Sequence, residues 1–261
     1  MAARNFLFCE VGELEAVLLA AVSIGMATAL GSALGCLLDK VPQKLSDVIS
    51  CGAAGIMLCA AIQGLVMPSV ELSGGNPLPA CVGIVLGGVF LDSMNRAAPK
   101  LLHRLELECS SKQLRNAMFV LAIAIHHFPE GMAAGVSFGT GEVTDTILVC
   151  GGIAIQNIPE AMIIMPAMAQ TGAERRKGFL AAAAGGGMEI LGLVLGYCAV
   201  QMTTAALPLL LAFAAGTMLF VIVDNIVPDT HGEGSGSAGT YGVLAGFCLM
   251  LILTGVLERI M

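Results

Sequence analysis

Two short segments near the middle of the chain share one arrangement of polar residues. The first is His126-His127-Phe128-Pro129-Glu130 and the second is Gln156-Asn157-Ile158-Pro159-Glu160. In each, a side chain that can bind a metal stands four positions before a glutamate, and residues four apart share one face of a helix. Imidazole, amide and carboxylate groups together suit divalent first-row ions such as Zn²⁺. The two segments therefore predict a metal site.

The composition places both segments inside a membrane. Hydrophobic residues make up 57% of the 261 residues and charged residues 12%, whereas a soluble domain carries roughly 25% charged residues. We expect an all-α polytopic membrane protein whose partners are divalent metal ions and the lipid bilayer, with no nucleic acid among them. The nine cysteines form no CxxC pair, which indicates small core residues rather than a thiolate metal site.

Eight segments qualify as spans, since a span needs about 20 mostly apolar residues. They cover approximately residues 14–38, 45–67, 78–97, 114–138, 146–169, 179–202, 207–227 and 241–260. The connections between them are too short for a second domain. We therefore expect a single transmembrane transporter domain over residues 1–261.

Lysine and arginine predict the orientation of these spans. Ten of the twelve lie in or beside the connections after spans one, three and five: Lys40, Lys44, Arg96, Lys100, Arg104, Lys112, Arg115, Arg175, Arg176 and Lys177. Basic residues stay on the cytoplasmic side, so both termini are expected to be extracytoplasmic. The seventh connection is an exception, because it carries Asp229, His231 and Glu233 and no basic residue.

Three glutamates lie near the midpoints of spans four, five and six, namely Glu130, Glu160 and Glu189. An acidic side chain at the centre of a bilayer costs about 2.5–3.5 kcal/mol on insertion scales. Three of them at one depth become tolerable when a cation or protons neutralise them. This cost is the physical reason to expect ions at the middle of the membrane.

The ligand types suggest two neighbouring metal sites. The first would consist of His126, Glu130, Gln156 and Glu160. The second would use His127, Asn157 and Glu189 and would share Glu130 and Glu160 with the first. His126 and His127 are adjacent, so they point about 100° apart on a helix and can serve different sites.

Pro129 and Pro159 accompany the ligands in both segments. A proline inside a helix removes one backbone hydrogen bond and frees the carbonyl four residues earlier, here those of Ile125 and Ile155. Irregular backbone at membrane depth is tolerated where it lines a wet cavity. Matching broken motifs in two antiparallel spans also predict an inverted repeat with a site at the midplane.

Other polar residues lie in or near the remaining spans. Those on a possible ion pathway are Met57, Glu71, Asn95, Asp224 and His231, and helix packing explains them equally well. The run Gly185-Gly186-Gly187 has two readings of equal weight, which are close packing against a neighbour and a closely approached backbone beside the site.

These motifs resemble those of the ZIP (Zrt/Irt-like protein) family of divalent metal transporters, in its bacterial, GufA-like branch. His126 to Gly131 is similar to the family's HNxPEG motif of span four, and Gln156 to Ala161 to the corresponding motif of span five. Further similar stretches are Ala54–Met57, Gly187–Ile190, Ala215–Met218 and Val223–Pro228. His127 stands where the family has Asn, Gln156 where many members have His, and Ala161 where Gly is usual.

The resemblance implies eight spans in a 3+2+3 arrangement with both termini outside. It implies a binuclear metal centre between spans four and five and uptake of Zn²⁺, or of Fe²⁺, Mn²⁺ or Cd²⁺, into the cytoplasm across the plasma membrane. It also implies a homodimer, and an elevator-like movement of spans one, four, five and six. The metal would be a transported substrate, and no cofactor is expected.

Two other functions compete with transport by alternating access. A metal-selective channel is disfavoured because tight binding by several ligands slows the exit of the ion. An intramembrane metalloprotease would need a His-Glu-x-x-His helix, and the chain has no such motif. We therefore do not expect an enzyme.

Overall fold

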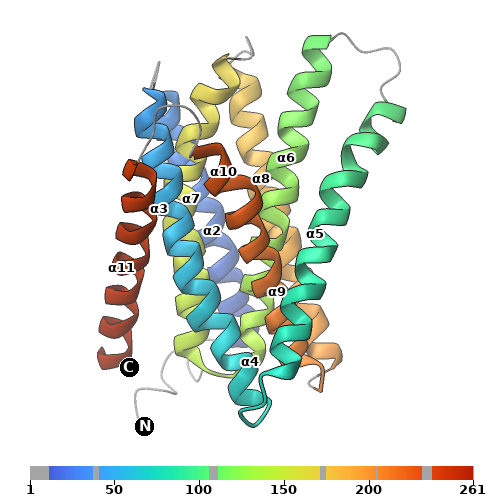
Figure 1. Cartoon of the computed structure of the whole chain (residues 1–261), viewed down its shortest axis with the longest axis vertical. Coiled ribbons are helices and arrows are strands. Elements are labelled where there is room, and N and C mark those ends of the chain that lie inside the picture. Colours follow the sequence, from blue (N-terminus) through green and yellow to red (C-terminus); the bar gives the residue numbers. More distant parts are fainter. Residues whose placement is uncertain are drawn as a thin grey trace.

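The computed structural model describes residues 12–37, 41–105, 111–170, 175–203, 205–230 and 237–260, and these form a bundle of long helices (Figure 1). Within these residues the helices join into eight rods. They are α2 (Glu13–Cys36); α3 (Gln43–Ala61) with η2 (Ile62–Val66) and α4 (Met67–Leu72); α5 (Leu78–Leu105); α6 (Ser111–Ser137) with η3 (Phe138–Thr140); α7 (Val143–Gln170); α8 (Arg175–Met202); α9 (Leu207–Phe220) with η4 (Val221–Ile226) and α10 (Val227–Thr230); and α11 (Ser237–Ile260).

Seven of these rods are long and apolar enough to cross a membrane. They are α2, the rod from α3 to α4, α5, α7, α8, the rod from α9 into η4, and α11. The prediction of an all-α protein with several membrane-spanning helices is therefore confirmed. The remaining rod, α6, has 27 residues and carries the first polar motif. An exact count of eight spans stays a prediction.

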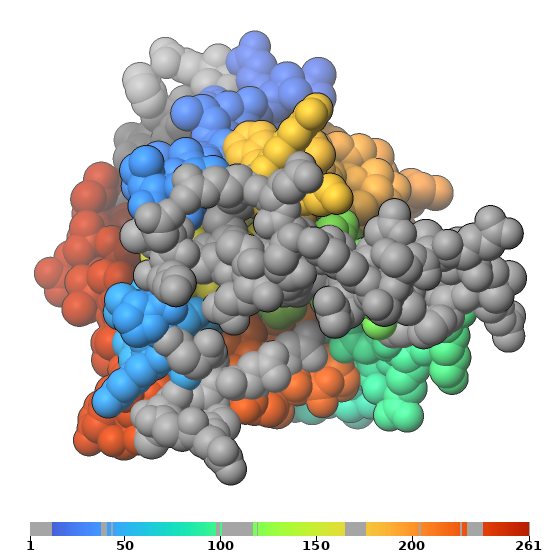
Figure 2. All heavy atoms as spheres, turned by 90° about the horizontal axis from the view of Figure 1, so that it is seen from above, coloured from blue at the N-terminus to red at the C-terminus, as the bar shows by residue number. Residues whose placement is uncertain are grey.

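The rods alternate in direction along the bundle. The start of α2 and the end of α11 lie at one end of the bundle in Figure 1, together with the connection between α4 and α5. The first turns of α3 and α8 and the last turns of α5, which contain Lys44, Arg176 and Lys100, lie at the other end. Figure 2 looks onto this second end, with α11 (red) at one margin and α5 (green) at the opposite margin. Both marginal helices expose leucine and valine side chains outward, as lipid-facing helices do.

The most extensive helix pairings are α6 with α8, α2 with α7, α5 with α9, and α3 with α11. In each pairing a glycine lets the two backbones approach closely. A Cβ atom added at Gly87 of α5 would meet the backbone of Phe213 and Thr217 in α9. One added at Gly246 of α11 would meet the backbone of Gly52 in α3.

Glycines also hold the two polar motifs against their neighbours. A Cβ atom at Gly31 of α2 would meet the carbonyl oxygen of Ile158 in α7. One at Gly192 of α8 would meet the carbonyl oxygen of Phe128 in α6. Phe128 and Ile158 occupy the same place in the two motifs. Each motif is therefore fixed by direct contact of its main chain with a glycine of another helix.

Two rods contain a widened π-helical turn that the sequence reasoning did not anticipate. These turns, η2 and η4, stand directly before the segments that contain Pro68 and Pro228. A proline has no N–H group and crowds the preceding turn, and a π turn accommodates such a defect without ending the helix. This is why the second rod continues to Leu72, beyond the predicted limit of residue 67.

Close backbone contact gives a prediction about stability at Gly55. A Cβ atom at this position would meet the carbonyl oxygen of Val243 and lie 2.7 Å from the nitrogen of Phe247, both in α11. We expect Gly55→Ala to separate α3 from α11 and to lower the free energy of unfolding by about 1–3 kcal/mol. Thermal unfolding of the purified protein in detergent, followed by far-ultraviolet circular dichroism, measures this change.

Gly255→Ala in α11 is the matched control, because nothing lies within 4 Å of the added Cβ atom. This control is expected to be neutral or to stabilise its helix by up to about 1 kcal/mol. Equal midpoints for the two variants would contradict the packing described above.

Candidate metal centre

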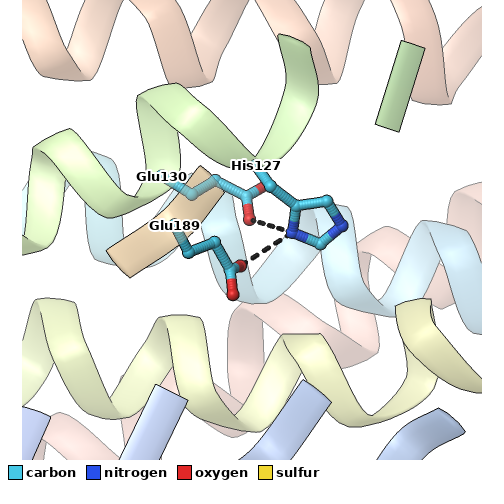
Figure 3. A group of neighbouring side chains, drawn as sticks. All are labelled: His127, Glu130 and Glu189. Atoms are coloured by element: carbon cyan, nitrogen blue, oxygen red, sulfur yellow. Dashed lines mark hydrogen bonds and ion pairs between the residues drawn. The ribbon is translucent and has the colours of Figure 1, made fainter. Parts of the chain in front are cut away.

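The polar centre of the bundle lies where α6 meets α8. His127, Glu130 and Glu189 offer ligand atoms that all lie within 4.8 Å of one another. His127 Nδ1 is 2.7 Å from Glu189 Oε1 and 3.6 Å from Glu130 Oε2. Figure 3 shows both carboxylates turned toward the imidazole ring. All three side chains are buried, with exposed fractions of 3%, 0% and 0%.

Helices α7 and α2 complete the surroundings of Glu189. The Asn157 amide donates from Nδ2 to Glu189 Oε1 at 2.7 Å and to Thr28 Oγ1 at 3.1 Å. The Thr28 hydroxyl lies 3.2 Å from Glu189 Oε2, to which it donates. Glu189 therefore faces donors from three other helices: His127 of α6, Asn157 of α7 and Thr28 of α2.

Glu130 has the opposite surroundings. In the part of the chain that the structure describes, neither of its carboxylate oxygens has a hydrogen-bond partner. It also lies within electrostatic range of Glu160 and Glu189, which are both acidic. A buried carboxylate that lacks donors is costly unless a cation or a proton compensates its charge.

Further buried oxygens without partners lie in the second motif. Among the described residues these are Gln156 Oε1, Asn157 Oδ1 and Glu160 Oε1. Buried polar groups are normally paired, so a cluster of unpaired ones needs an explanation. Oxygens from two carboxylates and two amides, together with an imidazole nitrogen, form a donor set that suits a divalent first-row cation.

The two adjacent histidines of α6 differ in their relation to the cluster. The rings of His126 and His127 have centroids 6.4 Å apart and planes inclined by 61°. His127 belongs to the cluster of three, whereas His126 does not. Four members of the predicted second site therefore lie together, namely His127, Glu130, Asn157 and Glu189. The place of Glu160 in it and the assignment of His126 to a first site stay predictions.

The predicted pathway residues are distributed over the other rods. Met57 is buried in α3, and Asn95 is half-buried in α5. Glu71 in α4 and Asp224 in η4 are exposed. His231 lies outside the described residues. Their role on an ion pathway stays a prediction.

The run of three glycines in α8 has a structural explanation for its first member. A Cβ atom at Gly185 would lie 2.9 Å from Cδ2 and 3.2 Å from Nε2 of His127. One at Gly186 would lie 3.5 Å from Cγ2 of Thr28, and one at Gly187 would meet nothing within 4 Å. Gly185 therefore provides the space that the His127 ring occupies.

The size of the residue that follows each motif glutamate is limited by the helix packed against it. A Cβ atom at Gly131 would overlap the Glu189 carbonyl, so α6 requires glycine there. In α7 the equivalent residue is Ala161, and its side chain faces Gly31 of α2. The methyl group of Ala161 fits because Gly31 lacks one.

Comparison with known proteins agrees with this geometry. The sequence model of the ZIP Zinc transporter family matches residues 95–254, a range that includes both motifs and Glu189. The chain belongs to the ZIP family.

Three relatives in this family align over most of the chain. Zinc transporter ZIPB of Bordetella bronchiseptica is 33% identical over 236 residues, covering 87% of this chain and 76% of the relative. Zinc transporter GufA of Myxococcus xanthus is 33% identical over 198 residues, covering 72% and 78%. Zinc transporter ZupT of Escherichia coli is 29% identical over 241 residues, covering 89% and 93%.

The family assignment confirms the resemblance that the motifs suggested. ZIP proteins are transporters and not enzymes, and zinc is their transported substrate rather than a cofactor. Sequence reasoning from the motifs missed Thr28, which has no metal-ligand chemistry of its own in a span of mostly apolar residues. One signal was available: Thr28 precedes Gly31 by the same spacing with which Glu189 precedes Gly192.

The space at Gly185 gives a prediction about metal affinity. Gly185→Ala would displace the His127 ring from its position beside Glu130 and Glu189, so we expect weaker Zn²⁺ binding, by roughly 10-fold or more. Isothermal titration of the purified protein with Zn²⁺ measures the dissociation constant. Gly187→Ala is the control, because the added methyl group has open space; equal losses in both variants would refute a specific effect on His127.

Proposed function

We propose that this protein carries Zn²⁺ through the membrane into the cytoplasm by alternating access. The observation that carries the proposal is the group of buried oxygens without partners around Glu130, Gln156 and Glu160. They lie on two helices that also provide His127 and Asn157. A binding site with several convergent ligands, in which the Glu130 carboxylate has no hydrogen-bond partner, is suited to an ion that enters and leaves.

The proposed centre is binuclear. His127, Glu130, Asn157 and Glu189 would hold one ion, and their close approach supports this set. His126, Gln156 and Glu160 would hold the second ion, with Glu130 and Glu160 shared between the two. Glu160 lies within electrostatic range of His127 and Glu189, as a bridging carboxylate must.

A 3+2+3 inverted repeat is the architecture we propose for the eight rods. In such a repeat α2 corresponds to α8, α3–α4 to α9–α10, α5 to α11 and α6 to α7. This correspondence relates the main pairings to one another. The α2–α7 pairing corresponds to α8–α6, and the α3–α11 pairing corresponds to α9–α5. The glycine contacts follow the same exchange. Gly31 on Ile158 corresponds to Gly192 on Phe128.

The sequences that precede the two π turns also support the inverted repeat. Ala-Ala-Gly-x-Met-Leu precedes η2 as residues 53–58 and precedes η4 as residues 214–219. Inverted repeats place the substrate site at the midplane between the two halves. The central rods α6 and α7 are where the polar residues lie.

The position of the ligands suggests which part moves. Helix α2 packs on α7 and α8, and α6 packs on α7 and α8, whereas α5 packs on α9 and α11 packs on α3; α7 also contacts α3, and α6 contacts α9. The group of α2, α6, α7 and α8 holds all the proposed ligands. We propose that it moves as one body against the group of α3, α5, α9 and α11, in the elevator-like manner that the family resemblance implies.

Orientation and assembly complete the proposal. The basic ends of α3, α5 and α8 face the cytoplasm, both termini are extracytoplasmic, and the plasma membrane is the location. A homodimer is proposed from the family resemblance alone.

Zinc uptake tests the function and the site together. Purified protein in liposomes that contain a zinc-sensitive dye is expected to give saturable uptake. Glu130→Gln and Glu160→Gln keep the shape but remove the charge that binds the ion, and we expect each to reduce uptake by about 10-fold or more.

Glu258→Gln is the control, because this glutamate is exposed near the end of α11. Normal flux in both motif variants would refute the site assignment. Flux that rises linearly with zinc concentration would indicate a channel.

Fusion proteins test the topology. With the C-terminus outside the cytoplasm, an alkaline phosphatase fused after residue 261 is expected to be active in bacterial cells, and a green fluorescent protein at the same point is expected to be dark. A fusion after residue 177, beside Arg176, should give the opposite pair of results. A fluorescent C-terminal fusion would overturn the proposed orientation.

A further inference from the structure

Thr28 of α2 is buried and contacts the polar centre through its hydroxyl group. Its Oγ1 lies 3.2 Å from Glu189 Oε2, 3.2 Å from the carbonyl oxygen of Ile24 and 3.1 Å from Asn157 Nδ2. The first two atoms are acceptors and the third is a donor. A hydroxyl group can donate and accept at the same time, so it can satisfy Glu189 and Asn157 together.

Glu189 determines which way the Asn157 amide faces, and Thr28 accepts the second amide proton. Nδ2 donates to Thr28 Oγ1 and to Glu189 Oε1, so both of its protons have acceptors. Oδ1 is then the end of the amide that is left buried without a partner. If the amide were turned over, Oδ1 would face the Glu189 carboxylate oxygen, which is repulsive. The observed orientation therefore presents the one amide atom that can bind a cation.

Thr28 has a second effect on Glu189 itself. Glu189 Oε1 interacts with His127 and Asn157, and Oε2 interacts with Thr28. Oε1 is thus held from α6 and α7, whereas among these contacts Oε2 is held from α2 alone. Removing the hydroxyl would leave Oε2 without this donor and allow the carboxylate to rotate.

We propose that Thr28 is a positioning residue of the metal centre, which orients the Glu189 carboxylate and the Asn157 amide for an incoming cation; this rests on the proposed function. Thr28 itself is not a ligand. Its role is that of an outer partner of two ligand side chains, and such partners orient ligands and tune their affinity.

The internal relation between α2 and α8 explains why this position carries a hydroxyl group. Thr28 precedes Gly31 and Gly35 by the spacing with which Glu189 precedes Gly192 and Gly196. One helix therefore provides a carboxylate and its counterpart provides the group that holds it. A carboxylate at both positions would place two like charges together and would remove the hydroxyl that donates to Glu189 Oε2.

Three variants test this role. Thr28→Val keeps the shape and removes the hydroxyl, whereas Thr28→Ser keeps the hydroxyl and removes the methyl. Thr254→Val in α11 is the matched control, because Thr254 is also buried and its hydroxyl donates to the carbonyl of its own helix, at Met250. Each purified variant is titrated with Zn²⁺ and assayed for uptake in liposomes, and its thermal unfolding is recorded without metal.

For Thr28→Val we expect the dissociation constant for Zn²⁺ and the KM of uptake to rise about 10–100-fold, with a smaller change in kcat. Thr28→Ser and Thr254→Val are expected to remain close to the wild type. Bound Co²⁺ serves as a spectroscopic probe, and its visible absorption is expected to change in Thr28→Val, because the geometry of two ligands changes.

An unchanged dissociation constant and Co²⁺ spectrum in a folded Thr28→Val protein would overturn the proposal, as would equal impairment of Thr28→Ser. If Thr28→Val unfolds without metal, the comparison of Thr28→Ala with Thr28→Ser decides the question by the same criteria. Failure of the proposed function appears differently, as a lack of saturable zinc uptake in the wild-type protein itself.

Discussion

The structure depends on carboxylates that are buried in an apolar bundle without enough donors to satisfy them. Glu189 is surrounded by hydrogen-bond donors. Neither carboxylate oxygen of Glu130 has a hydrogen-bond partner among the described residues, although the side chain is fully buried and lies 3.6 Å from His127 Nδ1. Burying such a group in a bilayer costs several kcal/mol unless a proton or a cation neutralises it. The helices around the site therefore bring together further oxygen and nitrogen ligands, which make a mobile cation the natural source of compensation.

Close helix packing makes this arrangement possible. Gly31, Gly185 and Gly192 allow α2 and α8 to approach α6 and α7 so that polar side chains from four helices meet. Gly185 leaves room for His127, and Gly131 leaves room for the backbone at Glu189. Larger residues at these positions would move the helices apart and separate the side chains that are proposed to bind the cation. Packing and ion binding are thus two consequences of the same contacts.

Part of this could be predicted from the sequence, for reasons that particular residues illustrate. The motif around His126 and Glu130 indicated a polar centre on this helix, and the structure brings His127 of the same motif to Glu130. The rarity of charge in apolar spans made Glu189 conspicuous. These signals are local, and local periodicity is what a single sequence reveals best.

The remaining features depend on contacts between distant segments. Thr28 is an ordinary residue for an apolar helix, and only the fold brings it into contact with Glu189, which is 161 positions away in the sequence. The π turns before Pro68 and Pro228 were missed because a proline in a sequence indicates a helix defect but not how the backbone absorbs it. The space at Gly185 is visible only once His127 is placed beside it.

The contacts of Gly31 with Ile158 and of Gly192 with Phe128 have a mechanical consequence. They join main chain to main chain, so no flexible side chain lies between the helices to take up strain. Protein interiors packed in this way shift between discrete arrangements rather than deform gradually. A force exerted on Glu130 or Glu160 by an arriving ion would pass into α8 and α2 with little loss. The two glycines would thereby act as stiff couplings, converting a local electrostatic pull into displacement of whole helices.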